Sequence, residues 1–91
     1  MTFECHITAP SGSADKVKKA GKDLHWKFSA IDGDPVLGAG VHCYLTTHDA
    51  TFARIKQRMK AAAHVLEAAG VEVIRMKIEA IMYDTKTGVG L

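Results

Sequence analysis

Two histidines, His6 and His42, are the side chains of this sequence best suited to proton transfer, and each lies where polar and apolar residues alternate. An imidazole changes charge near neutral pH, so it can act as a general base or a general acid. Hydroxyl and cationic side chains that could bind a phosphate occupy similar stretches. These are Thr8, Lys27, Ser29, Tyr44, Thr46, Arg75 and Lys77. The combined set is typical of a site that binds an anion and moves a proton.

Alternation with a period of two predicts strands that present these side chains on one face. Residues 3–8, 25–31 and 41–46 alternate clearly, with the histidines and hydroxyls opposite the apolar side chains. Residues 71–83 form a fourth predicted strand, in which apolar side chains on both faces indicate a bulge or a subunit contact. Residues 32–40 are rich in glycine, aspartate and proline, which predicts a protruding loop between the second and third strands.

Two amphipathic helices are predicted between the strands. The first is capped by Ser13 and runs as far as Leu24. The second is capped by Thr47 or Asp49 and carries a continuous apolar stripe. It ends at Gly70, where a residue in the left-handed conformation would terminate a helix.

The predicted order is strand, helix, strand, strand, helix, strand, which is typical of an α+β, ferredoxin-like βαββαβ fold. Such a fold has a four-stranded antiparallel sheet with two helices on one face, and its first and third strands are neighbours in the middle. His6 and His42 would then lie on adjacent central strands of the open face, within reach of one small ligand. We expect a single domain over residues 1–91, with a loose tail at residues 86–91.

The chain has 91 residues, 47% of them apolar, and a formal net charge of +2. These values fit one globular domain and argue against a long nucleic-acid partner, which would need a stronger basic patch. No stretch reads as a membrane span or a secretion signal, so we expect a cytoplasmic protein with no membrane partner. A short domain buries a small share of its surface, so we also expect a homo-oligomer. Cys5 and Cys43 lack the spacing of a zinc or redox pair and are expected to be buried thiols.

At His6-Ile7-Thr8 the chain resembles the His-x-Thr signature of the 2H phosphoesterases, which act on cyclic phosphates and 2′,5′-linked ribonucleotides. The resemblance implies that His6 and a second histidine act as general base and general acid, and that Thr8 holds the phosphate. The second copy would be His42-Cys43-Tyr44, where Tyr44 replaces the threonine or serine of the family pattern. The resemblance covers these two strands and implies a metal-independent phosphoesterase that uses two histidines.

Other known site types fit the residues less well. Acylphosphatases share this length and fold, but the chain has no glycine-rich phosphate loop with an arginine after its first strand. An RNA-recognition motif would place aromatic side chains on both central strands, whereas only Tyr44 qualifies. A metal site of His6 and His42 with Glu4 or Glu79 has suitable ligand types but no compact spacing, so we expect neither a metal nor another cofactor.

The sequence leaves two functional hypotheses from different classes. The first is a domain that binds a small phosphorylated or otherwise anionic ligand, such as a nucleotide, on its open sheet face. If hydrolysis follows, His6 and His42 would transfer the protons while Thr8, Thr46 and Arg75 steady the phosphate. The alternative is a non-enzymatic homo-oligomeric or partner-interaction module that binds no small molecule.

Overall fold

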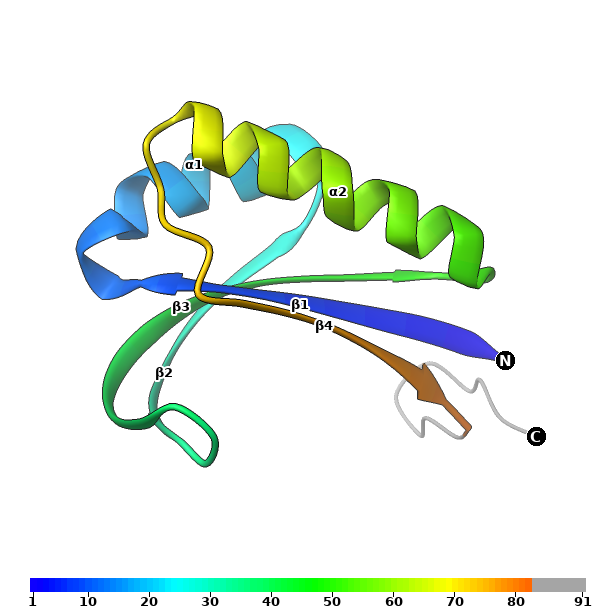
Figure 1. The fold of residues 1–91 in the computed structure, drawn as a ribbon, viewed down its shortest axis with the longest axis horizontal. Helices are drawn as coiled ribbons and strands as arrows, with labels where there is room; N and C mark the ends of the chain where they lie inside the picture. The colour runs from blue at the N-terminus through cyan, green and yellow to red at the C-terminus, as the bar shows by residue number, and fades with distance from the viewer. Residues whose placement is uncertain (83–91) are drawn as a thin grey trace.

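Four strands, two α-helices and one short 3₁₀-helix follow one another within residues 1–82, the part of the chain that the computed structural model describes (Figure 1). In chain order they are β1 (Thr2–Pro10), η1 (Ser11–Ser13), α1 (Ala14–Leu24), β2 (Lys27–Asp34), β3 (Gly38–Asp49), α2 (Phe52–Ala68) and β4 (Arg75–Ile81). The predicted tail at residues 86–91 lies outside the described residues. No helix within residues 1–82 is both long and apolar enough to cross a membrane.

The strands form one antiparallel sheet in the order β2-β3-β1-β4, so β1 and β3 lie in the middle. Figure 1 shows both α-helices on the same side of the sheet, and no helix of residues 1–82 lies on the opposite side. This arrangement confirms the predicted α+β, ferredoxin-like fold. The sheet positions the site, because alternate residues of each strand point either to the helices or to the open face.

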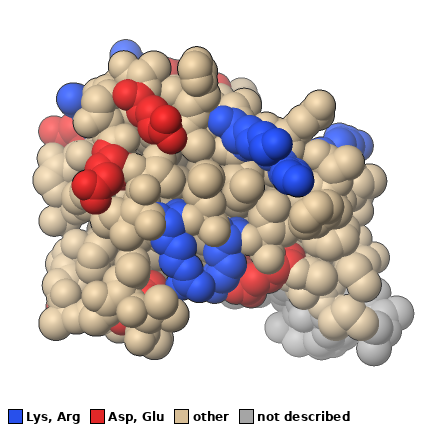
Figure 2. Space-filling model, in the orientation of Figure 1, with Lys and Arg blue, Asp and Glu red and all other residues tan. Residues whose placement is uncertain are grey.

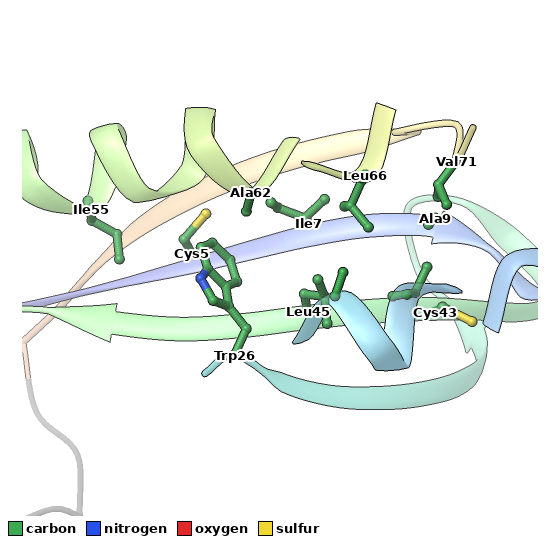
Figure 3. Close-up of a cluster of buried hydrophobic side chains, with 12 residues drawn as sticks. Cys5, Ile7, Ala9, Trp26, Cys43, Leu45, Ile55, Ala62, Leu66 and Val71 are labelled. Carbon is green, nitrogen blue, oxygen red and sulfur yellow. The ribbon is translucent and has the colours of Figure 1, made fainter. Parts of the chain in front are cut away.

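The core lies between the sheet and the helices (Figure 3), and its four largest fully buried side chains, Ile7, Leu45, Ile55 and Leu66, come from the two central strands and α2. Cys5 and Ile7 of β1 pack with Cys43 and Leu45 of β3 and with Leu66 of α2, and none of the five is more than 1% exposed. Both cysteines are therefore buried and unpaired, as predicted. Burial raises the pKa of the Cys5 thiol to about 11 and also raises the pKa of Cys43.

The end of α1 explains why β2 begins later than predicted. His25 has a left-handed backbone conformation with φ 63° and caps the helix, so β2 starts at Lys27 rather than at His25. The backbone N–H of Trp26 donates to the Gly21 carbonyl at 2.8 Å. A Cβ atom at Gly21 would lie 2.7 Å from Leu45 Cδ2. Glycine therefore lets α1 approach the sheet closely.

The helix starts also differ from the predicted caps. Thr51, rather than Thr47 or Asp49, caps α2, and its Oγ1 accepts a hydrogen bond from the Arg54 N–H at 3.2 Å. The reason is that β3 continues as far as Asp49. Ser13 does precede α1, but its side chain makes no capping hydrogen bond.

The protruding loop predicted at residues 32–40 is wrong. β2 and β3 pair as far as Asp34 and Gly38, so only residues 35–37 remain as a turn. Asp34 Oδ1 accepts hydrogen bonds from two backbone N–H groups of this turn, at 2.8 and 3.1 Å. An aspartate that bonds the backbone in this way stabilises a tight turn. Asp34 therefore stabilises a short turn that joins two strands longer than predicted.

A bulge at Gly33 bends this hairpin. The pairing of β2 with β3 shifts register between Asp32 and Asp34, and Gly33 between them has φ 76°. A bulge of this kind increases the local twist of a strand. Figure 1 shows the hairpin end curving away from the helix layer, on the open side of the sheet.

β4 is shorter and more regular than predicted. It begins at Arg75 instead of Val71 and pairs with β1 as far as Ile81 with no register shift, so the predicted bulge is absent from the described strand. Val71 is buried in the core, which accounts for the blurred alternation there. Gly70 has φ 80° just beyond α2, which confirms the predicted left-handed residue.

Candidate functional site

Side chains on the open face form rows that cross neighbouring strands. The Thr8 row contains Arg75, Thr8, Tyr44 and Ser29, and the His6 row contains Lys77, His6, Thr46 and Lys27. Strands in a sheet are about 4.8 Å apart, and residues two apart along a strand are separated by about 7 Å. The two rows therefore bring most of the predicted site residues into one small area.

A cavity of about 200 Å³ lies over these two rows. Its lining consists of His6, Thr8, Ser29, Ile31, Asp34, Tyr44, Thr46, Arg75 and Lys77. The bent β2–β3 hairpin contributes Ile31 and Asp34, which form one wall. Thr8 is only 3% exposed and Tyr44 only 6%, although neither α1 nor α2 covers this face. The open face is thus hollowed, and every predicted site residue except His42 and Lys27 lines the hollow.

His6 and His42 do not meet, so the prediction that both lie within reach of one small ligand is wrong. The register places Thr46 opposite His6, and it places His42 opposite Pro10. His42 is therefore two rows away from His6, about 13 Å along the strands. A mechanism that needs both imidazoles at one phosphate is not assembled in this cavity.

The two cations that line the cavity, Lys77 and Arg75, have different neighbours. Lys77 forms an ion pair with Glu79, and the hydrogen bond from Lys77 lowers the pKa of that carboxyl. Arg75 lies beside Thr8 in its row, and its charge helps to lower the pKa of Asp34. Lys27 is exposed and lies outside the cavity. Figure 2 shows basic and acidic side chains intermixed on the visible face, without an extended patch of one sign.

Asp34 and Tyr44 close the cavity on the hairpin side. The Tyr44 hydroxyl donates to Asp34 Oδ2 at 2.5 Å. This hydrogen bond and the two from the turn N–H groups hold the pKa of the Asp34 carboxyl down to about 2. Burial, followed by the hydrogen bond to Asp34, raises the pKa of Tyr44 to about 12. The neutral phenol and the ionised carboxylate are thus the stable forms over most of the pH scale.

A second hydrogen-bonded group is centred on His6. Its Nδ1 lies 3.0 Å from Thr46 Oγ1, and its Nε2 contacts the Glu4 carboxylate. The other oxygen of Glu4 lies 2.7 Å from His48 Nε2. The four residues are two pairs of direct cross-strand neighbours, Glu4 with His48 and His6 with Thr46. The Glu4 carboxylate, the His6 imidazole and the Thr46 hydroxyl are therefore connected in series, and the last two line the cavity.

Sequence reasoning did not place His48, Ile31 or Asp34 at the site, and it considered Glu4 only as a possible metal ligand. The alternation that selected Tyr44 and Thr46 continues to His48, so that residue could have been found if the strand had been extended. Alternation also places Glu4 on the same face as His6, but only the pairing register of β1 with β3 shows that His48 is its neighbour. The position of Asp34 depends on the bulge at Gly33, which has no period-two signal.

No group of three or more His, Cys, Asp or Glu side chains within residues 1–82 has an arrangement that could hold a metal ion. The cluster of Glu4, His6 and His48 is instead closed by its own hydrogen bonds.

Comparison with protein-family models gave no match for this chain, and comparison with curated proteins gave none either. The resemblance of His6-Ile7-Thr8 to the 2H phosphoesterases therefore stays a prediction.

Proposed function

We propose that this domain binds a small phosphorylated or otherwise anionic molecule in the cavity of the open sheet face. The observation that supports the proposal is the lining itself. It combines two fixed cations, Arg75 and Lys77, with the hydroxyls of Thr8, Ser29 and Thr46. Cations and hydroxyls converging on one concave surface are the groups that bind phosphate oxygens.

The volume of the cavity limits what it can enclose. Sites that surround a drug-sized ligand are usually about 300–1,000 Å³. At about 200 Å³ this cavity holds the phosphate or carboxylate end of a molecule and a few further atoms. A nucleotide would therefore bind with its phosphate inside and its base outside the cavity.

The negative charge of Asp34 opposes anion binding, but hydrogen bonds to its carboxylate and the nearby Arg75 weaken this repulsion. Both carboxylate oxygens already accept hydrogen bonds, one from Tyr44 and the other from the turn. Arg75 adds a favourable charge near the same carboxylate. Asp34 therefore acts as a wall of the site, and the phosphate is expected on the side of Thr8 and His6.

Calorimetric titration with inorganic phosphate and with a small phosphomonoester tests the proposal. Replacing Arg75 or Lys77 with alanine should weaken binding about 10- to 100-fold, which is the effect of losing one charge-assisted hydrogen bond. Lys27→Ala is the matched control. Lys27 belongs to the His6 row, as Lys77 does, but it lies outside the cavity. Equal losses in all three variants, or no saturable binding by the wild type, would overturn the proposal.

A second candidate function, a homo-oligomeric module, is favoured by the exposed edge strand β4. Ile74 and Met76 on or next to this strand are 36% and 44% exposed. Antiparallel pairing of two copies about Ile78 would place Lys77 of each copy opposite Glu79 of the other, which stabilises such a pair. Light scattering should then show a dimer that Glu79→Lys disrupts and Glu67→Lys, on the exposed side of α2, leaves intact. A monomeric wild type rules this candidate out.

A further inference from the structure

The cavity contains a hydroxyl that is hydrogen-bonded to an imidazole. Thr46 lines the cavity, and its Oγ1 lies 3.0 Å from His6 Nδ1. The opposite ring nitrogen of His6 contacts the carboxylate of Glu4. A hydroxyl, an imidazole and a carboxylate joined in this order form the arrangement by which enzymes activate a nucleophile.

The chemistry of the partners decides which nitrogen of His6 carries the proton. An ionised carboxylate can only accept hydrogen bonds, so Nε2 of the neutral imidazole must donate to Glu4. Nδ1 then has a free lone pair and accepts from the Thr46 hydroxyl. Glu4 thus fixes the ring with its basic nitrogen toward the cavity, which makes Glu4 a positioning residue.

The setting of this group is consistent with catalysis. The side chains of His6 and Glu4 are 28% and 22% exposed, so the bonds lie at the sheet surface but are partly shielded from water. Lys77 is the direct neighbour of His6 on the other side, and Arg75 lies in the next row. Both cations line the same cavity as the hydroxyl, so they would stabilise the negative charge that develops on a phosphoryl group under attack there.

We propose that Thr46, activated by His6 and Glu4, attacks the phosphorus of a phosphomonoester bound in the cavity. This inference rests on the proposed function, since it uses the same anion site. Thr46 Oγ1 forms a bond to phosphorus while its proton moves to His6 Nδ1. The bond from phosphorus to the leaving oxygen breaks, and that oxygen keeps the electron pair. Glu4 stabilises the imidazolium that results.

Hydrolysis of the phosphothreonine completes the reaction. Water attacks phosphorus, and the bond from phosphorus to Thr46 Oγ1 breaks. His6 returns its proton to that oxygen, and the proton of the attacking water passes to solvent. The substrate class is a phosphomonoester whose leaving group departs readily, because the described lining places no second histidine near the leaving oxygen.

The test uses 4-nitrophenyl phosphate, which releases a coloured phenolate, together with mass spectrometry of the intact protein and its peptides. The expected result is a burst of phenolate with phosphothreonine at Thr46. Thr46→Val and His6→Ala should slow the burst about 100-fold or more, the scale of a lost nucleophile or general base. Thr46→Ser should retain it. His42→Ala is the matched control, because His42 shares the strand and the face of Thr46 but lies outside the cavity.

Glu4→Gln separates a positioning role from a structural one. Glutamine preserves the shape and can still accept from His6, but it cannot offset the imidazolium charge. The burst should slow about 10- to 100-fold, while the affinity for inorganic phosphate stays within about twofold of the wild type. An unchanged burst in Glu4→Gln removes Glu4 from the mechanism.

The outcomes distinguish this inference from the proposed function. If the wild type binds phosphate but is not phosphorylated at Thr46, or is phosphorylated elsewhere, the inference fails and the anion site stands. If Thr46 is phosphorylated although inorganic phosphate does not bind, the nucleophile stands and the anion site fails. If neither binding nor phosphorylation occurs, both are wrong.

Discussion

The Tyr44 hydroxyl donates a 2.5 Å hydrogen bond to Asp34 Oδ2, and this bond joins the turn of the β2–β3 hairpin to the middle of the sheet. Tyr44 lies beside Thr8 in its row, whereas Asp34 lies beyond the bulge at Gly33. The bond therefore connects the floor of the cavity to its wall.

Tyr44 should titrate well above an ordinary tyrosine. Its pKa is raised from about 10 to about 12, so the stability that comes from the buried neutral phenol is complete below pH 10. That stability is lost as the pH rises through about 12. The ultraviolet absorbance of tyrosinate, measured against pH, checks this. The transition that disappears in Tyr44→Phe is the one that belongs to Tyr44. Removal of a transition near pH 10 by Tyr44→Phe would contradict the buried hydrogen bond.

Asp34 should confer acid sensitivity on the hairpin. Its pKa is lowered to about 2 by the hydrogen bond from Tyr44 and then by the turn N–H groups. A lowered carboxyl pKa contributes stability above about pH 4, and this contribution disappears as the pH falls toward 2. Unfolding measured in denaturant between pH 5 and 2 should show a steeper loss for the wild type than for Asp34→Asn. Identical curves for the two proteins would contradict the prediction.

The strands and their faces could be predicted because the alternation of side chains is local. Cys5 and Ile7 on one face of β1, and His6 and Thr8 on the other, follow from a period of two alone. This is why most of the cavity lining was correctly placed on one side of one sheet. The fold itself follows from the order of the elements.

The register and the hairpin could not be predicted, because they depend on contacts between distant residues. A shift of pairing changes which side chain on β3 faces His6, and alternation does not reveal whether that neighbour is His42 or Thr46. The bend at Gly33 is equally hidden, since its signal is a positive φ within a segment that otherwise resembles a loop. The wall that Asp34 supplies was missed for the same reason.

Gly21→Ala should destabilise the domain even though alanine favours helices. The new methyl group would lie 2.7 Å from Leu45 Cδ2 and 3.1 Å from the Trp26 carbonyl oxygen, and Leu45 is itself 0% exposed. Overpacking costs about 1–3 kcal/mol and helix propensity returns up to about 1 kcal/mol, so we expect a net loss of about 1–2 kcal/mol. Thermal unfolding checks this.

Gly12→Ala is the matched control for that substitution, because a Cβ atom at Gly12 has nothing within 4 Å. Its melting temperature should stay close to that of the wild type, whereas Gly21→Ala should melt roughly 5–15 °C lower. Equal melting temperatures for the two variants would show that α1 does not need glycine to pack on β3.

The two cysteines should be inert in the native protein. Cys5 and Cys43 are 0% and 1% exposed, and burial raises the pKa of both thiols, to about 11 for Cys5. The reactive thiolate is therefore scarce and shielded at neutral pH. A colorimetric thiol reagent should modify neither residue until denaturant is added, and then both. Rapid reaction of either thiol in the native state would be inconsistent with the core.

We propose that the cavity between the hairpin and β4 is an anion site. The most direct test is an NMR titration of the wild-type protein with phosphate that follows the assigned signals of each strand. We predict saturable shifts at His6, Thr8 and Arg75, with His42 and Lys27 unchanged. Shifts that are absent, that do not saturate, or that centre on His42 would contradict an anion site in this cavity.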